Sequence, residues 1–273
     1  LGAGFDPLGD SSTKFTGTFD GQGYTISNIF MNGSDNVGVF GYTEGATIQN
    51  TGVVNANVEC SSYDCGSLAG RVSNSIIDNC YATGQVSEGY TTGGLVGSIG
   101  TQSTLRNSYF SGNVSVDSWN SGGLVGYGGS DSTIINSFSS GIFNGGPSGY
   151  HFGGLVGIVA STFIVNNSYS TMSVSGDNQL GGLIGDCSGA KIENSYATGA
   201  VSGDDRVGGV CGYSYNSTIK NSYATSTITA NTNLGGLIGG LSVGTSISNG
   251  YWLDHAGSSA TNCYDGGDTG CNP

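Results

Sequence analysis

One short block recurs eight times along this chain and decides what it can fold into. In its commonest form the block reads Gly-Gly-Leu-Val-Gly, and its last glycine returns every 27 to 31 residues. A unit of about 28 residues cannot bury an apolar edge alone, so neighbouring units must stack to share a core. Repetition at this period therefore predicts a solenoid. The eight copies end at Gly41, Gly70, Gly97, Gly126, Gly157, Gly185, Gly212 and Gly239.

A second block follows each copy and centres on an asparagine, as in the Ser-Thr-Ile-Lys-Asn-Ser-Tyr stretch around Asn221. The residue two positions before this asparagine is always apolar, and the residue directly before it is polar in all copies but one. This alternation is typical of a β-strand with one buried face. In six copies a further apolar residue stands seven positions after the asparagine. The asparagines are Asn50, Asn79, Asn107, Asn136, Asn167, Asn194, Asn221 and Asn249, and we interpret Asn28 as an earlier relative that opens the series.

These patterns predict an all-β fold, a parallel β-helix or β-solenoid of about nine coils. Each coil would hold about 28 residues and about three short strands, because no segment shows the spacing of an amphipathic helix. We expect a lead-in or cap over residues 1–22, repeats over 23–252, and a cysteine-containing tail or cap over 253–273. Since the repeat is under way close to the first residue and no signal peptide precedes it, we interpret the chain as an excerpt of a longer protein.

Stacking of like residues on like gives each repeated position a predicted role. The apolar row before the asparagines and the Tyr/Phe row two residues after them are both expected inside. The asparagines are expected at a bend, where their amides bond to neighbouring asparagines and to turn backbone. The double glycines mark either a tight corner or a position that needs a positive φ. The aromatic row is Tyr81, Tyr109, Phe138, Tyr169, Tyr196, Tyr223 and Tyr251.

Composition excludes several functions. Six Lys and Arg residues stand against nineteen Asp and Glu residues, a net charge of −13. Nucleic-acid binding through phosphates and polybasic contact with a membrane surface both need clustered cations, so neither is expected. The sequence also lacks an apolar run long enough for a membrane-spanning helix.

The recurring Gly-Gly-Leu-Val-Gly and Asn-Ser-Tyr-Ala-Thr-Gly blocks resemble the GLUG-motif repeat. The resemblance extends over about residues 5–252, and the opening around Phe-Thr-Gly-Thr-Phe-Asp-Gly-Gln-Gly resembles the lead-in to such arrays. GLUG repeats occur in bacterial and archaeal surface proteins and adhesins, and beside the catalytic part of some immunoglobulin-A-cleaving metallopeptidases. The resemblance implies a β-solenoid and an extracellular, secreted or cell-surface location, and it implies no catalytic residue.

Seven cysteines bear on the redox environment. Cys60 and Cys65 are five residues apart, and Cys263 and Cys271 are eight apart. Neither pair has the spacing of a zinc site, so we expect two local disulfides formed in an oxidising compartment. Cys211 replaces a Val or Ile of the repeated block, and we interpret it as a small buried apolar residue. The sequence does not assign a role to Cys80 or Cys187.

No catalytic or metal site is predicted. His151 and His255 lack zinc-site spacing, and His151 is expected to be a solvated loop residue. Paired acids at Asp204–Asp205, Asp265/Asp268 and Asp6/Asp10 could serve a polysaccharide-active β-helix enzyme, but we interpret them as solvated turn residues. No cofactor is expected, although Asp265 and Asp268 leave calcium binding open. Four sequons are possible glycosylation sites: Asn32, Asn113, Asn166 and Asn216.

The leading hypothesis is a non-catalytic structural protein, a stalk, adhesin or filament subunit. It would associate end to end or form part of a longer surface protein, because the two ends of a solenoid present strand edges. The alternatives are a polysaccharide-active enzyme and a glycan-binding module with exposed aromatics at Tyr63, Tyr90, Trp119, Tyr150 and Phe152. Partner contacts are expected on the loops before the glycine blocks, and the longest of these ends in Tyr150, His151 and Phe152.

Overall fold

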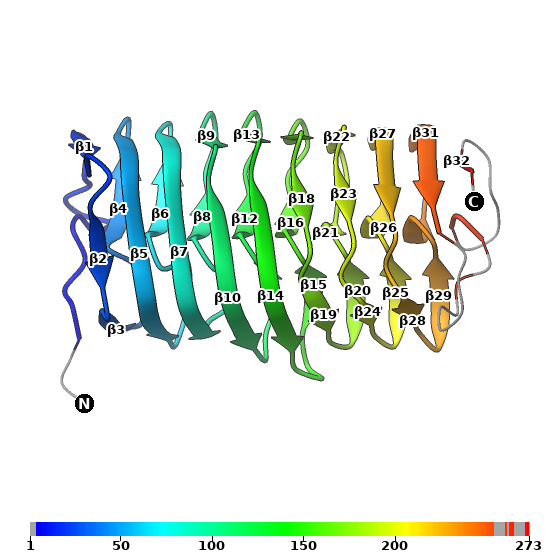
Figure 1. Ribbon diagram of the computed structural model, residues 1–273, viewed down its shortest axis with the longest axis horizontal. Coiled ribbons are helices and arrows are strands. Elements are labelled where there is room, and N and C mark those ends of the chain that lie inside the picture. The colour runs from blue at the N-terminus through cyan, green and yellow to red at the C-terminus, as the bar shows by residue number, and fades with distance from the viewer. Residues whose placement is uncertain (1–3, 254–259, 261, 265–270, 273) are drawn as a thin grey trace.

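The chain winds into an elongated parallel β-solenoid (Figure 1). The structure, a computed structural model, describes residues 4–253, 260, 262–264 and 271–272. Within these residues there is no α-helix, and therefore no helix that could cross a membrane. About eight turns of roughly 28 residues stack from the blue amino-terminal end to the red carboxyl-terminal end. This confirms the predicted fold class, with a coil number close to the nine expected.

Each coil contributes strands to a large sheet that is bent lengthwise. This 19-strand sheet collects the segments on both sides of the repeated asparagines. Its strands are β1 (Thr18–Asp20), β2 (Thr25–Ser27), β3 (Phe30–Gly33), β5 (Thr47–Cys60), β7 (Ile76–Glu88), β9 (Thr104–Arg106), β10 (Tyr109–Val116), β13 (Thr133–Ile135), β14 (Phe138–Gly145), β17 (Ile164–Asn166), β18 (Tyr169–Ser170), β19 (Ser173–Ser175), β22 (Lys191–Glu193), β23 (Tyr196–Ala197), β24 (Val201–Ser202), β27 (Thr218–Ala224), β28 (Ile228–Thr229), β31 (Ser246–Trp252) and β32 (Cys271–Asn272).

Two smaller sheets close the coil. The eight-strand sheet takes one strand from each turn, and each strand begins at the fourth residue of the glycine block. Its members are β4 (Phe40–Glu44), β6 (Ala69–Ser73), β8 (Val96–Ile99), β12 (Val125–Gly128), β16 (Val156–Val159), β21 (Ile184–Asp186), β26 (Cys211–Ser214) and β30 (Ile238–Leu241). The five-strand sheet lies at the corner before the block and consists of β11 (Ser121–Gly122), β15 (Tyr150–Gly153), β20 (Asn178–Gly181), β25 (Asp205–Gly208) and β29 (Thr232–Gly235).

The core is a set of apolar rows that run along the solenoid axis. Parallel pairing places each residue opposite its counterpart one coil away, so Ile77 faces Leu105 and Ile192 faces Ile219. The predicted apolar rows are buried as expected along most of the solenoid, while Ile26 and Ile247 near its two ends are only partly buried. The row before the asparagines is Ile48, Ile77, Leu105, Ile134, Val165, Ile192 and Ile219, and the row after them is Val86, Val114, Phe143, Val174, Val201 and Ile228.

The repeated asparagines form a bend, as predicted. Each adopts the left-handed backbone conformation, with φ of 52° at Asn79 and 50° at Asn221. Asparagine tolerates this region better than other non-glycine residues. Several side chains also join along the row: Asn79 Nδ2 donates to Asn50 Oδ1 over 2.9 Å, and Asn249 Nδ2 donates to Asn221 Oδ1 over 2.8 Å.

The prediction that the Tyr/Phe row stacks inside was wrong. Tyr109 and Tyr196 are only partly buried, while the residues on either side of each are buried. The left-handed asparagine shifts the strand alternation, so the residue one position after it faces inward and the residue two positions after it faces outward. The rings form a stacked ladder on the outer surface. Adjacent centroids from Tyr81 to Tyr223 lie 4.8–5.0 Å apart, with interplanar angles of 1–8°.

The first coil also departs from the prediction. Asn28 does not open the main asparagine row, because β2 pairs with the later part of β5 and places Ser27 opposite Val54. The residue opposite Gln49 is instead Asp20. The spacing from Asn28 to Asn50 is shorter than a full coil, and this difference accounts for the mismatch.

The double glycines serve close approach between coils. A Cβ atom on Gly94 would lie 2.2 Å from a ring carbon of Phe110 and 2.3 Å from the carbonyl oxygen of Gly123. A Cβ atom on Gly93 would lie 2.1 Å from the carbonyl oxygen of Val96. Neither glycine has a positive φ, so the tight-corner alternative accounts for them. The boundaries predicted near residues 22 and 252 stay predictions.

Candidate functional site: an axial seam beside an aromatic strip

Two outward-facing rows of side chains meet along the solenoid, and we call their junction the axial seam. The face row occupies the position directly after each glycine block, in the eight-strand sheet. It reads Tyr42, Arg71, Ser98, Tyr127, Ile158, Asp186, Tyr213 and Gly240. The corner row lies at the start of the five-strand sheet and reads Asn36, Asp64, Thr91, Asn120, His151, Gln179, Arg206 and Asn233.

Contacts across the axial seam join these rows. Arg71 Nη1 lies 3.3 Å from Asp64 Oδ2. Further along, the guanidinium of Arg206 lies over the ring of Tyr213, 5.3 Å from its centroid. At these two places the seam brings together charged and aromatic groups.

The axial seam opens into a hollow of about 540 Å³ near its amino-terminal end. Thr91 and Ser98 have small side chains and lie between the larger Arg71 and Tyr127, which leaves the space unfilled. The volume falls within the range of small-ligand pockets, ~300–1,000 Å³. We call this space the Tyr63 hollow. Its lining is Ser11, Asp35, Asn36, Tyr42, Tyr63, Asp64, Arg71, Thr91, Ser98 and Tyr127.

Asp64 is the buried charged group of the Tyr63 hollow, with only 8% of its surface exposed. Burial raises the pKa of its carboxyl group to about 6, and the charge of Asp35 adds to the rise. Arg71 opposes this shift through its charge and its hydrogen bond. A carboxylate and a guanidinium thus stand side by side at the wall of the hollow, one accepting and the other donating hydrogen bonds.

An aromatic strip runs along the outside of the corner, directly beside the axial seam. Tyr63 stacks on Tyr90 at 5.1 Å, and Trp119 stacks on Tyr150 at 5.0 Å. Tyr90 and Trp119 meet edge to face at 6.3 Å and join the two pairs. All four side chains are exposed, as the sequence predicted for this edge. The preceding coil presents Asp35 where the next ring would stand, so the strip ends at Tyr63.

The three residues predicted as a contact loop, Tyr150, His151 and Phe152, differ in exposure in the structure. Tyr150 is exposed and belongs to the aromatic strip. His151 is half-buried: its Nδ1 lies 2.8 Å from Asn120 Oδ1, and its Nε2 lies 3.9 Å from Asp186 Oδ2. Burial lowers the pKa of His151, although Asp186 opposes that shift. The interpretation of His151 as a solvated loop residue was therefore wrong.

Phe152 was also predicted to be exposed, and that prediction was wrong. Its side chain is fully buried and packs against Phe143 at 5.3 Å between ring centroids. Phe152 stands opposite Ser121 and Leu180, at a position that points into the core in successive coils. Alternation along β15 therefore turns Tyr150 outward and Phe152 inward.

Three disulfides connect the described cysteines. The structure joins Cys60 to Cys65 and Cys263 to Cys271, the two local pairs expected from their spacing. The third disulfide, Cys187–Cys211, corrects the interpretation of Cys211 as a lone apolar residue. It links two adjacent coils, whose strands β21 and β26 pair with each other.

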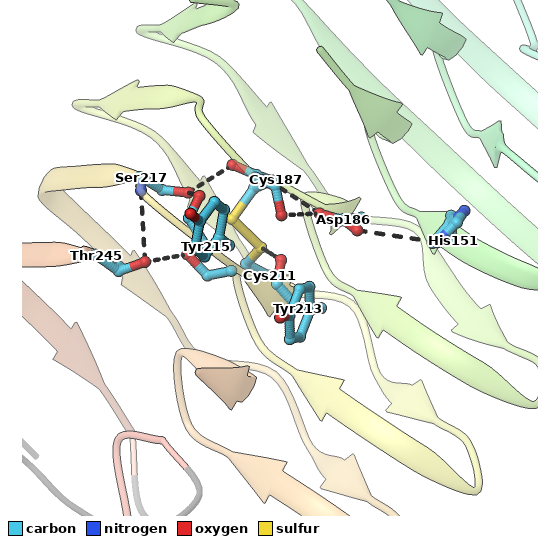
Figure 2. Close-up of a disulfide and its surroundings, with 10 residues drawn as sticks. His151, Asp186, Cys187, Cys211, Tyr213, Tyr215, Ser217 and Thr245 are labelled. Atoms are coloured by element: carbon cyan, nitrogen blue, oxygen red, sulfur yellow. Dashed lines mark hydrogen bonds and ion pairs between the residues drawn. A yellow bond between two sulfur atoms is a disulfide. The ribbon is translucent and has the colours of Figure 1, made fainter. Parts of the chain in front are cut away.

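Figure 2 shows the surroundings of the Cys187–Cys211 disulfide. Ser217 Oγ donates a hydrogen bond to the Cys187 carbonyl oxygen over 2.7 Å. Asp186 precedes the disulfide and points toward His151 on the previous coil. The disulfide therefore reinforces the coils next to the axial seam. The seventh cysteine, Cys80, is a buried free thiol, and burial raises its pKa to about 12.

Asp10 and the Asp204–Asp205 pair form turn and coil-to-coil hydrogen bonds, and Asp6 is exposed. Asp10 accepts from the backbone nitrogens of Ser12 and Thr13, and these bonds lower its pKa. Asp205 Oδ1 accepts from Thr232 Oγ1 over 2.8 Å, on the next coil. Among the described residues, no group of three or more His, Cys, Asp or Glu side chains is placed to hold a metal ion. Asp265, Asp268 and His255 lie outside the described residues.

The four possible glycosylation sites differ in accessibility. Asn32, Asn113 and Asn216 are exposed. Asn166 is half-buried, and its Oδ1 accepts a hydrogen bond from Asn194 Nδ2 over 3.0 Å. Occupancy of these sites stays a prediction.

The sequence analysis missed the Tyr63 hollow. Asp64, Arg71, Tyr42 and Tyr127 were not singled out, although three of them follow directly after a glycine block. That position varies from coil to coil while the block itself is nearly constant. A position that varies between coils, next to a block that hardly varies, is expected to face outward, and this pattern could have identified the row from the sequence.

Comparison with known proteins agrees with this architecture. Residues 61–87, 88–115 and 203–229 match the family model of the GLUG motif. These three segments carry the GLUG motif. Residues 88–115 of this match carry Tyr90, Thr91 and Ser98, so one motif copy contributes directly to the aromatic strip and the hollow.

Proteins that resemble this chain include a curated relative and several solved structures. Halomucin from Haloquadratum walsbyi is 37% identical over 125 residues, which cover 42% of this chain and 1% of halomucin. A structure of IgA1 protease aligns over 90% of this chain and 18% of that chain, with a TM-score of 0.55 and 20% identity. A candidate immunoglobulin A1 protease from Bacteroides ovatus aligns at a TM-score of 0.45 and 22% identity, over 78% of this chain and 62% of that chain. The IgA1 protease alignment supports the fold alone, and the chain spans only a small part of halomucin and of that protease.

Proposed function

We propose that this chain is a rigid, non-catalytic segment of a cell-surface or secreted protein, acting as a stalk, adhesin or filament subunit. The observation that carries the proposal is the unbroken register of the coils. Gln49, Asp78 and Arg106 occupy equivalent positions, and the same row continues to Lys220. Such a stack has one continuous core and no hinge along this row, so it holds its two ends at a fixed separation.

Location outside the cytosol is supported by three disulfides and by the match to halomucin. The test is to treat intact producing cells with an amine-reactive label that cannot cross membranes. Lys191 is a suitable reporter, because half of its side chain is exposed. We expect labelled Lys191 peptide from intact cells or their medium. Labelling that requires lysis would contradict the proposed location.

A non-catalytic role is supported by the bonding of the paired acids. Asp204 and Asp205 accept hydrogen bonds from Asn231 and Thr232 of the next coil, which gives them a structural role. The competing hypothesis, a polysaccharide-active enzyme, is tested by incubating the protein with polysaccharides and measuring new reducing ends. We expect none above the buffer control. Release of reducing ends that disappears in Asp204→Asn and Asp205→Asn variants would support the enzyme instead.

End-to-end self-association belongs to the same proposal. The first and last coils of a solenoid carry strand edges that can pair with another chain. Docking of one end on the other is heterologous and gives open filaments. Sedimentation across a range of protein concentrations is expected to show elongated species that grow with concentration. A monomer at every concentration would contradict self-association and leave the spacer role standing.

A further inference from the structure

We propose that the Tyr63 hollow binds a neutral saccharide. This inference goes beyond the proposed spacer role and does not depend on it. It rests on four properties of the hollow: an uncovered aromatic face, polar groups of both hydrogen-bonding types, a charge balance that disfavours anions, and an extension along several coils.

The aromatic face comes from the end of the aromatic strip. Tyr63 is 56% exposed and stacks on Tyr90 with one face only. On its other side the preceding coil presents Asp35, whose Oδ1 accepts a hydrogen bond from the backbone nitrogen of Tyr63. The hollow begins at this point and is lined by both residues. A sugar ring placed there would extend the existing stack by one more flat ring, with its C–H face on the tyrosine.

The polar groups of the hollow match sugar hydroxyls. A hydroxyl both donates and accepts, so it is best held by a carboxylate next to a cationic donor. Asp64 and Arg71 provide this pair at 3.3 Å, and Asp64 is more than nine-tenths buried. Thr91 and Ser98, which are also buried, add hydroxyl groups to the lining.

The charges of the hollow select against acidic ligands. Asp35 and Asp64 outnumber Arg71 there, in a chain whose net charge is −13. The attraction for a cationic ligand is weakened in turn, because Lys14 and Arg71 already stand over the ring of Tyr42, 4.7 Å and 5.4 Å from its centroid, and offset part of the negative charge. A neutral saccharide meets neither obstacle.

The hollow extends along the solenoid axis. Its lining comes from four successive coils, represented by Tyr42, Arg71, Ser98 and Tyr127. Adjacent coils are separated by the strand spacing, ~4.8 Å. A short oligosaccharide that lies along the axis therefore fits better than a single sugar.

The experiment measures binding of the whole chain to a set of neutral trisaccharides. The set contains trisaccharides of glucose, mannose, galactose, xylose and N-acetylglucosamine, with trigalacturonic acid as the acidic member. Saturation-transfer NMR identifies binders, and calorimetry gives Kd. We expect at least one neutral member to bind with a Kd of about 1 mM or tighter. Failure of every neutral member at that level, or tightest binding of the acidic member, would overturn the proposal.

Variants locate the binding. Tyr63→Ala is expected to weaken it about tenfold, in line with the loss of one aromatic stacking contact, and Asp64→Asn is expected to weaken it as well. Two matched controls remove exposed aromatic rings that do not line the hollow: Trp119→Ala within the strip and Tyr215→Ala outside it. Both are expected to bind within about twofold of the wild type. Binding that survives Tyr63→Ala, or that is lost in Trp119→Ala, would refute the hollow as the site.

Discussion

Replacing Tyr196 by alanine tests the placement of the aromatic ladder on the outer surface. Tyr196 stacks on Tyr169 at 4.9 Å and on Tyr223 at 4.8 Å, and its side chain is only partly buried. Each stacked pair contributes ~0.5–1.5 kcal/mol beyond burial. Loss of both contacts should therefore lower the free energy of unfolding by about 1–3 kcal/mol. A fully buried aromatic would cost more, ~3–5 kcal/mol.

Phe110 provides the internal comparison. It is fully buried, and its ring lies against the backbone of Gly94. Phe110→Ala should cost ~3–5 kcal/mol because it leaves a cavity that the glycine-lined coil cannot fill. Urea unfolding followed by far-UV circular dichroism, with the slopes of the transitions compared, gives both values under the same conditions. Equal or larger destabilisation by Tyr196→Ala would refute the outward placement of the ladder.

Four other predictions test the packing, the buried charge, the disulfides and the asparagine bend. Gly97→Ala should prevent folding or shift the unfolding midpoint strongly, because its Cβ atom would lie 2.2 Å from the Cys65 backbone nitrogen; a normal midpoint would contradict the close packing of coils. The pKa of Asp64 is raised to about 6, so the folded state holds a proton that the unfolded state loses above its ordinary value of 3.8. The contribution of Asp64 to the free energy of unfolding therefore falls by up to about 3 kcal/mol as pH rises from about 4 to above 6. The stability of the Asp64→Asn variant relative to wild type should rise over the same pH range. A difference between variant and wild type that does not change with pH would refute the burial of this charge. Non-reducing peptide mapping should recover Cys187 joined to Cys211, with Cys80 alkylated only after unfolding; free Cys187 and Cys211 would contradict the inter-coil link. Asn221→Ala should lower the free energy of unfolding by about 1–2 kcal/mol, and Asn221→Gly should lower it less, because only glycine keeps the left-handed conformation without strain. The same urea titration measures both variants. Equal losses would assign the effect to the lost amide hydrogen bonds instead.

The repeat made much of the fold predictable. Periodic Ile, Leu and Val positions identified the buried rows around Ile77 and Val86, and the asparagine bend followed from the recurrence of a residue that tolerates positive φ. Alternation failed only across that bend. A left-handed residue changes which later positions face inward, so Tyr196 was assigned to the wrong side of the sheet. The rule of alternate faces holds within a strand and does not carry through a bend.

The hollow depends on how the chain turns within a coil, and the third disulfide depends on the contact between two coils. Arg71 meets Asp64 because the chain turns between the two within one coil, and a linear pattern does not give that angle. Cys187 and Cys211 are 24 residues apart, less than one repeat, so they do not occupy the same position in their coils. The burial of Phe152 could have been predicted from the sequence, since the equivalent residues of the next two coils, Leu180 and Val207, are apolar.

The separation of Gln49 and Lys220 tests the central claim most directly. Register places these two outward-facing positions six coil steps apart in one row, with Gln49 partly buried and Lys220 exposed. At ~4.8 Å per step, the backbone distance between them is about 29 Å. Spin labels carried at these two positions by unnatural amino acids, which leave the cysteines untouched, report the distance by pulsed electron paramagnetic resonance. A rigid in-register solenoid predicts one narrow distribution near that value after allowance for the label arms. A broad distribution, or one centred far from it, would contradict the account of this chain as a rigid spacer.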